Sequence, residues 1–248
     1  MRVSTSAWAI AICCIAAFTT TAVSGAFLTG TNGMICLLDY QIGSLTLNLY
    51  SSMVANHDLA RSRGIGIKVV SGATMQDILR RVFSVDNDCD MFVGPGSSGR
   101  SMAINPALPA LHLEFAAGAM DLANKAAFPY FSRINPSAQD QGFGMADVAH
   151  HFGVTTMNVL SAQDAFAASI TASVGIRAKQ NNQTIDELLY MSESAPEELP
   201  NIIARLERSP ARYLAISTSP TSPLFQRVLQ LMADSRYLET HEVITSTG

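Results

Sequence analysis

One glycine- and serine-rich turn carries the residue types that suit ligand chemistry. Residues 94–99 read GPGSSG and directly follow the apolar run MFV. Glycine allows a sharp turn and lets a bound group come close to the backbone. Ser97 and Ser98 add hydroxyl groups and N–H donors where a helix is expected to begin, and helix N-termini favour anions. We therefore expect residues 94–98, the serine turn, to bind a small ligand, although such turns also serve only to join a strand to a helix.

The same turn satisfies the dinucleotide-binding spacing GxGxxG. Its glycines stand at 94, 96 and 99, and Glu114 follows at the distance where an acidic residue binds the ribose hydroxyls. Two observations oppose this interpretation. Pro106 and Pro109 would end the following helix after little more than a turn, and no candidate base with a partner follows. A dinucleotide-dependent oxidoreductase is therefore the weaker alternative, and we expect neither catalysis nor a bound cofactor.

Composition narrows the classes of partner. The 248 residues are 48% hydrophobic and 15% charged, with a net charge of −4 and no basic run. This balance is typical of a globular protein that does not bind nucleic acid. Five histidines are present, and none has a second ligand at zinc-site spacing. We expect no metal site.

The first 25 residues have the pattern of a secretory signal peptide. Arg2 supplies the positive charge, residues 7–18 form an apolar stretch, and Val23 and Gly25 supply small residues for cleavage after Gly25. The stretch is shorter than the roughly 20 residues of a membrane-spanning helix, so cleavage is favoured over an uncleaved anchor. Later apolar runs are too short or too polar to cross a bilayer. The sequence predicts a secreted or extracellular chain that carries no membrane domain of its own.

Strand and helix patterns alternate along the remaining chain. Apolar and β-branched runs predict strands, and apolar residues at helical spacing predict helices between them. Such alternation favours parallel sheets covered by helices, an α/β fold, with a change of lobe near residues 136–142. The expected strands are residues 35–39, 64–70, 91–93, 111–115, 156–161, 211–217 and 241–246, and residues 184–192 are expected to form a strand or a mixture of strand and helix. The expected helices are residues 44–59, 74–82, 100–105, 142–152, 166–180, 195–208 and 222–233.

Four segments in order resemble the extracellular ligand-binding region of family C G-protein-coupled receptors and of natriuretic-peptide-type receptors. Type B GABA and metabotropic glutamate receptors are the most similar in pattern. The segments are FVGPGSS at 92–98, DLANK at 121–125, FPYFSRINPS at 128–137 and MADVAHHFG at 145–153. The third is the most specific, because Pro, Phe, Arg and Pro recur at fixed offsets.

The resemblance implies a bilobal fold like that of type I periplasmic binding proteins. It implies a first lobe at residues 26–138 and a second, incomplete lobe at residues 139–248. The ligand would lie between the turns that follow the strands, and closure of the lobes would bring these turns onto one small molecule. The implied ligand-binding residues are Ser97, Ser98, Ala117, Gly118 and Phe166.

Several positions depart from the family pattern. In the amino-acid receptors the serine turn holds an α-carboxylate, and the second lobe holds the amino group. Ala116 and Gly118 stand here where those receptors carry hydroxyl groups, and Ala138 replaces an acidic residue. The ligand is therefore expected to be amino-acid-like or a small anion, without a firm assignment. A receptor sensor region, which could dimerise, is the favoured function, and a free-standing solute-binding protein is the alternative.

Three further residues suggest covalent features. Cys36 and Cys89 remain after signal cleavage, and they form one possible pair in an oxidising compartment, with two buried free thiols as the alternative. In the implied fold their strands are neighbours, so we expect Cα atoms under about 7 Å apart. Asn182 begins the sequon NQT, a glycosylation site if the host is eukaryotic.

Overall fold

The structure is a computed structural model that describes residues 33–39, 62, 64–84, 88–219, 222–235 and 237–245. The chain divides into two compact units. The first comprises Met1–Ala117 and Asn124–Ile134, and the second comprises Gly118–Ala123 and Asn135–Gly248. The expected signal peptide and the expected helix at residues 44–59 lie outside the described residues. The lobe limits expected from the sequence, 26–138 and 139–248, stay predictions.

The first unit is built on a five-stranded parallel sheet in the order β2-β1-β3-β4-β5. Parallel strands buried by helices read as short apolar runs, which is why the sequence indicated four of the five. The short fifth strand was not expected. The strands are β1 (Met34–Asp39), β2 (Gly66–Ser71), β3 (Met91–Val93), β4 (Leu111–Glu114) and β5 (Phe131–Arg133).

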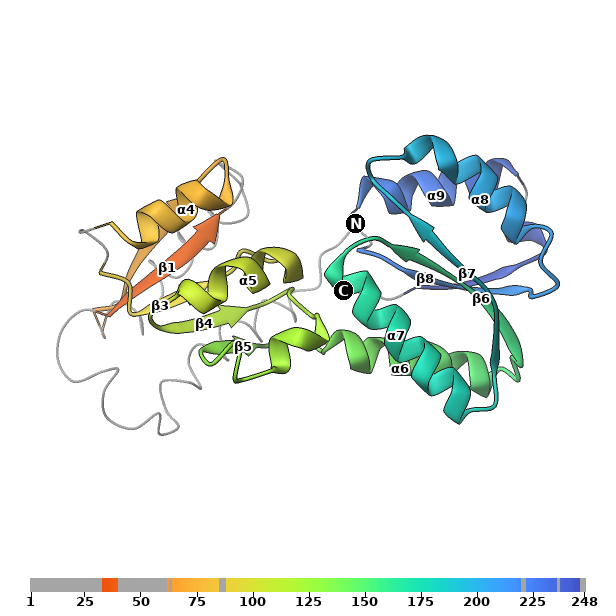
Figure 1. Ribbon diagram of the computed structural model, residues 1–248, viewed down its shortest axis with the longest axis horizontal. Helices are drawn as coiled ribbons and strands as arrows, with labels where there is room; N and C mark the ends of the chain where they lie inside the picture. The colour runs from red at the N-terminus through yellow and green to blue at the C-terminus, as the bar shows by residue number, and fades with distance from the viewer. Residues whose placement is uncertain are drawn as a thin grey trace. The chain divides into compact units, whose positions relative to one another are not determined.

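Helices α4 (Met75–Val82) and α5 (Ser98–Ile104) pack on one face of this sheet (Figure 1). Thr74 starts α4 through a capping box with Asp77. Helix α5 begins two residues before the expected start at residue 100. It continues into a 3₁₀ turn, η1 (Asn105–Ala107), because a proline ring tolerates the first turn of a helix but not its interior.

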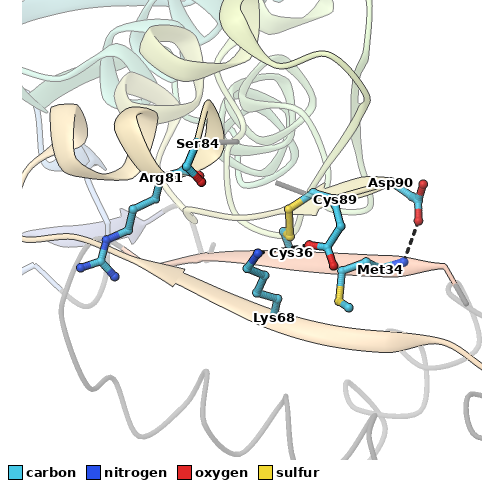
Figure 2. Close-up of a disulfide and its surroundings, with 8 residues drawn as sticks. Met34, Cys36, Lys68, Arg81, Ser84, Cys89 and Asp90 are labelled. Carbon is cyan, nitrogen blue, oxygen red and sulfur yellow. Dashed lines mark hydrogen bonds and ion pairs between the residues drawn. A yellow bond between two sulfur atoms is a disulfide. The ribbon is translucent and has the colours of Figure 1, made fainter. Parts of the chain in front are cut away.

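A disulfide joins the first strand to the segment before the third. Cys36 lies on β1 and Cys89 two residues before β3, and their Cα atoms are 5.6 Å apart (Figure 2). The parallel pairing of β1 with β3 brings the two segments together. The main-chain N–H of Met34 also donates to Asp90 Oδ2 at 2.7 Å. The expected cysteine pairing is confirmed, and free thiols are excluded.

The second unit contains a four-stranded parallel sheet in the order β7-β6-β8-β9. Alternate strand residues feed two separate cores, one under α6 and α7 and one under α8 and α9, so helices cover both faces (Figure 1). The strands are β6 (Thr156–Ala162), β7 (Thr184–Met191), β8 (Tyr213–Ser217) and β9 (Glu242–Thr245). The helices are α6 (Ala138–His151), α7 (Ala165–Gln180), α8 (Leu199–Leu206) and α9 (Pro223–Asp234).

Two helices of this unit differ from expectation. Helix α6 begins at Ala138 rather than at residue 142, because Ser137 and Asp140 form a capping box. The helix expected at residues 195–208 starts as a 3₁₀ turn, η3 (Pro196–Glu198), and becomes α-helical only at Leu199. Two further 3₁₀ turns, η2 (Met120–Ala123) and η4 (Tyr237–Glu239), were not foreseen. The α/β class with parallel sheets flanked by helices is confirmed.

None of the helices among the described residues combines the length and the apolar character needed to cross a membrane.

Candidate functional site

The serine turn follows β3 at the carboxyl edge of the first sheet. Gly94 and Gly96 adopt φ values of 91° and 76°, a region that favours glycine, and the Gly94–Pro95 peptide is cis. The N–H of Gly94 donates to the carbonyl of Leu113 at 3.1 Å, which ties the turn to the end of β4. A Cβ on Gly94 would lie 2.9 Å from the carbonyl oxygen of Leu38. The glycines are therefore required by the shape of the turn itself.

The two serines of the turn differ in accessibility. Ser97 is the N-cap residue of α5, is half-buried, and makes no capping hydrogen bond with its side chain. Ser98 is the first residue of the helix and is only 4% exposed. Of the two expected ligand-binding serines, Ser97 is the more open to a bound molecule.

A buried carboxylate lies directly beneath this turn. Glu114 ends β4 and is completely buried. Its two oxygens each accept the main-chain N–H of Gly96 at 3.2 Å, and one accepts the hydroxyl of Ser101 on α5. The N–H of Phe115 donates to it at 3.3 Å. Glu114 thus joins turn, helix and strand through a single side chain.

A second buried polar pair, His112 and Asn105, lies next to Glu114 and again joins β4 to the end of α5. His112 on β4 and Asn105 after α5 are both buried. His112 Nε2 donates to the carbonyl oxygen of Gly94, and the Asn105 side-chain amide donates to His112 Nδ1 at 3.0 Å. His112 Nε2 also lies 3.6 Å from Glu114 Oε1. In this arrangement Nε2 is the donor and Nδ1 the acceptor.

This geometry argues against the dinucleotide alternative. In that pattern the acidic residue must face the ribose hydroxyls at the strand end. Glu114 instead points inward and is held by main-chain and hydroxyl donors of its own unit. It is a structural anchor of the turn, and the GxGxxG spacing is explained by the positive φ angles of two of its three glycines.

Gly118 and Phe166, two expected site residues, lie together in the second unit. A Cβ on Gly118 would be 2.7 Å from Phe166 Cε2, so only glycine leaves room for this ring position. Asp164 caps α7 by accepting the N–H of Phe166 at 2.8 Å. Ala117, the remaining expected residue, is buried at the end of a segment of the first unit. The roles of all five residues in binding stay predictions.

One aromatic residue at the same edge was not expected to take part. Phe115 follows Glu114 and is 42% exposed, and its ring lies 3.1 Å from where a Cβ on Gly96 would stand. The ring therefore packs against the serine turn. Its apolar character and its place at a strand end were the available signals, but the sequence alone did not show that it turns toward the glycines.

Two other expectations concern metals and glycosylation. Among the residues that the structure describes, no three His, Cys, Asp or Glu side chains gather as a metal site would require. Asn182 is exposed at the turn between α7 and β7, with φ 55°. Its glycosylation stays a prediction.

Solved structures of bacterial binding proteins share this fold. A solute-binding protein of an ABC transporter from Rhodopseudomonas palustris BisB5, in complex with 3,4-dihydroxybenzoic acid, matches 86% of this chain with a TM-score of 0.68 and 14% identity. A periplasmic binding protein from Burkholderia mallei matches 86% with a TM-score of 0.69 and 16% identity. This chain spans 61% and 60% of their lengths. At these identities the likeness concerns the fold alone.

Family membership rests on the sequence comparison. No curated protein sequence matches the chain. The model of the receptor family ligand-binding region matches residues 56–241, which is most of the chain and includes the serine turn, Glu114 and Phe166. The chain therefore belongs to the receptor family ligand-binding region.

Proposed function

We propose that this chain is the extracellular small-molecule sensor region of a receptor of the family C G-protein-coupled type and has no catalytic activity of its own. The observation that carries the proposal is the receptor-family match over residues 56–241. In open α/β sheets ligands bind beyond the carboxyl ends of the strands, and the serine turn lies at such an end. The disulfide between Cys36 and Cys89 favours an oxidising, extracytoplasmic compartment.

The residues proposed to bind ligand are Ser97, Ser98 and Ala117 in the first unit, and Gly118 and Phe166 in the second, each considered within its own unit. Ser97 is the residue to test first, because it is only half-buried and its side chain makes no capping bond. Loss of one hydrogen bond of this kind weakens binding by about 0.5–1.5 kcal/mol.

A free-standing solute-binding protein is the second candidate. It is favoured by one specific observation, the shared fold of the two bacterial binding proteins, one of which holds 3,4-dihydroxybenzoic acid. Sequencing the transcript beyond the codon for Gly248 separates the two. Several apolar spans downstream would support the receptor, whereas a stop after a further strand–helix unit would support the soluble binder.

Ligand binding is tested by thermal unfolding of the full chain against a panel of amino acids, 3,4-dihydroxybenzoate, and small aliphatic and aromatic acids and amines. A ligand should raise the unfolding midpoint with increasing concentration. Ser97→Ala should weaken that ligand about two- to tenfold. Ser84→Ala, whose hydroxyl donates to Arg81 in the same unit, is the control and should leave binding unchanged. A chain that no member of the panel stabilises contradicts the proposed function.

A further inference from the structure

Strand β7 forms an open edge of the second sheet. Among the residues that the structure describes, it pairs with β6 on one side and with no strand on the other. The N–H of Gln163, which follows β6, donates to the carbonyl of Met191 at 3.1 Å. Because the main-chain groups of successive strand residues point to alternate sides, Leu189 and Met191 direct theirs toward β6. Leu188 and Tyr190 therefore direct their main-chain N–H and C=O groups toward the open edge.

The same two residues carry exposed apolar side chains. Leu188 is 42% exposed and Tyr190 is 49% exposed, whereas Leu189 and Met191 are buried. Side chains two residues apart share one face of a sheet, so Leu188 and Tyr190 lie side by side along the edge. An exposed apolar pair on a strand with an open edge is a surface that another strand can cover.

The other sheet edges carry features that discourage pairing. Edge strands in natural proteins are protected by short length, by lysine or by proline. Strand β2 carries Lys68, and β5 and β9 have only three and four residues. Strand β7 has eight residues and contains neither lysine nor proline. Of the four edges, β7 is therefore the one best suited to pair with another strand.

The two acidic residues of β7 are bound within their own unit. Glu187 forms an ion pair with Arg205 on α8 at 2.6 Å, and Asp186 Oδ2 accepts the hydroxyl of Ser209 at 2.6 Å. Both acids precede Leu188, at the irregularity in the pairing of β6 with β7. The half of the strand that carries the exposed apolar pair is therefore uncharged.

We propose that the edge of β7 binds a second copy of this chain, which adds its own β7 in the antiparallel direction. A two-fold axis at Leu189 places Leu188 of each copy opposite Tyr190 of the other. Both residues direct their main-chain groups to the edge, so each such pair exchanges two main-chain hydrogen bonds. An aliphatic side chain opposite an aromatic one adds to the stability of a cross-strand pair.

The same register keeps the acidic residues apart. Asp186 lies opposite Ser192 of the second copy, and Glu187 lies opposite Met191 of the second copy. Like charges directly opposite one another would weaken the pairing, and none meet here. A second copy thus supplies the complementary strand without any other partner. The contact uses the side of the sheet rather than the carboxyl ends of the strands, so it is independent of the proposed ligand-binding function.

Sedimentation equilibrium of the full chain at increasing concentration tests the dimer. A single strand edge is a small contact, so the wild type should pass from monomer to dimer with concentration and should not associate further. Leu188→Lys places a charge on the edge twice in each dimer and should weaken association about two- to thirtyfold. Val148→Lys, the same kind of change at a 45% exposed position on α6, is the matched control and should leave association unchanged.

Hydrogen exchange of the wild type separates strand pairing from association through side chains alone. The amide hydrogens of Leu188 and Tyr190 point to the open edge, so they should exchange rapidly at low concentration and slowly where the dimer forms. The amide hydrogen of Leu189 points to β6 and should stay protected at both concentrations. This measurement needs no variant, so it tests the inference even where Leu188→Lys does not fold.

Three results would overturn the inference. The first is a wild type that stays monomeric at the highest concentration, and the second is a Val148→Lys variant that associates as weakly as Leu188→Lys. The third is a dimer in which the amide hydrogens of Leu188 and Tyr190 exchange as fast as in the monomer. The ligand panel tests the proposed function separately, so failure of the dimer leaves that function standing.

Discussion

Asp147 on α6 receives two hydrogen bonds from Arg177 on α7, from Nε at 2.7 Å and from Nη2 at 3.0 Å. Asn181 adds a third at 2.9 Å. These bonds join the two helices that cover one face of the second sheet. The guanidinium of Arg177 and the amide of Asn181 lower the pKa of Asp147.

This pair predicts a pH-dependent contribution to the stability of the second unit. Because the pKa of Asp147 is lower in the folded than in the unfolded chain, the stabilisation is complete above the unfolded value and is lost as pH falls through the folded value. The effect is small, since both side chains are partly exposed. Asp147→Asn should lower the urea midpoint at pH 7, and the difference from wild type should shrink below about pH 4. Asp121→Asn, at an exposed position, is the control. A difference that stays constant with pH contradicts the prediction.

Two glycines of α6 predict opposite effects of the same substitution. A Cβ on Gly142 would lie 2.5 Å from the carbonyl oxygen of Ile170 and 2.6 Å from Ser173 Cβ, so the two helices would have to separate. Gly142→Ala should therefore lower the free energy of unfolding by about 1–3 kcal/mol. Nothing lies within 4 Å of a Cβ on Gly144, and Gly144→Ala should stabilise by about 0.5–1 kcal/mol. Urea unfolding measures both, and equal effects would show that α6 and α7 do not pack as described.

The disulfide predicts a large loss on reduction. Cys36 and Cys89 are 53 residues apart in sequence, and the chain-entropy model gives about 4 kcal/mol for a loop of this length. The double variant Cys36→Ser/Cys89→Ser should lose about this much free energy of unfolding. In a reducing agent, the wild type should have the same free energy of unfolding as the double variant. The reducing agent should not change the free energy of unfolding of the variant. Native thiols that react with an alkylating agent in the untreated protein would contradict the bond.

The hydrogen-bond direction between Asn105 and His112 is a testable prediction. The Asn105 amide nitrogen, 3.0 Å from Nδ1, implies a neutral ring protonated on Nε2. The side-chain oxygen of Asn105 has no hydrogen-bond partner among the described residues. A rotated amide would turn that oxygen toward a protonated Nδ1, and the ring would then be a cation beside Glu114. The ¹⁵N chemical shifts of His112 at pH 7 distinguish the two forms, and a proton on Nδ1 would contradict the hydrogen bond donated by the Asn105 amide.

The central strands β6 and β8 were predictable because almost all of their residues are buried. Strand β6 begins at Thr156 as expected and ends one residue after the expected limit. Strand β5 was missed, because its three residues lie between prolines and are strand-like only through pairing with β4. The early start of α6 was readable in the capping box of Ser137 and Asp140, but the glycines at 142 and 144 obscured it.

The position of the serine turn at a strand end could be predicted from the sequence, and the structural role of Glu114 could not. Its glycines and the nearby strand end are local features, which a sequence displays directly. The role of Glu114 depends on where α5 begins, because only a helix that starts at Ser98 brings Ser101 to the carboxylate. That contact arises from packing of a helix on a strand, and no spacing rule for dinucleotide sites anticipates it.

Because of the short segment Gly118–Ala123, neither unit can be expressed as one continuous piece of the chain. The polypeptide passes between them after Ala117, Ala123 and Ile134, so neither unit is one continuous stretch. The segment is fixed in the second unit by the N–H of Ala138, which donates to the carbonyl of Gly118 at 2.7 Å, and by the N–H of Met120, which donates to Ser169 Oγ at 3.1 Å. A fragment beginning at Asn135 would therefore lack part of its own unit. Exchange of one unit between relatives by recombination would need three coordinated junctions, so the two units should be inherited together.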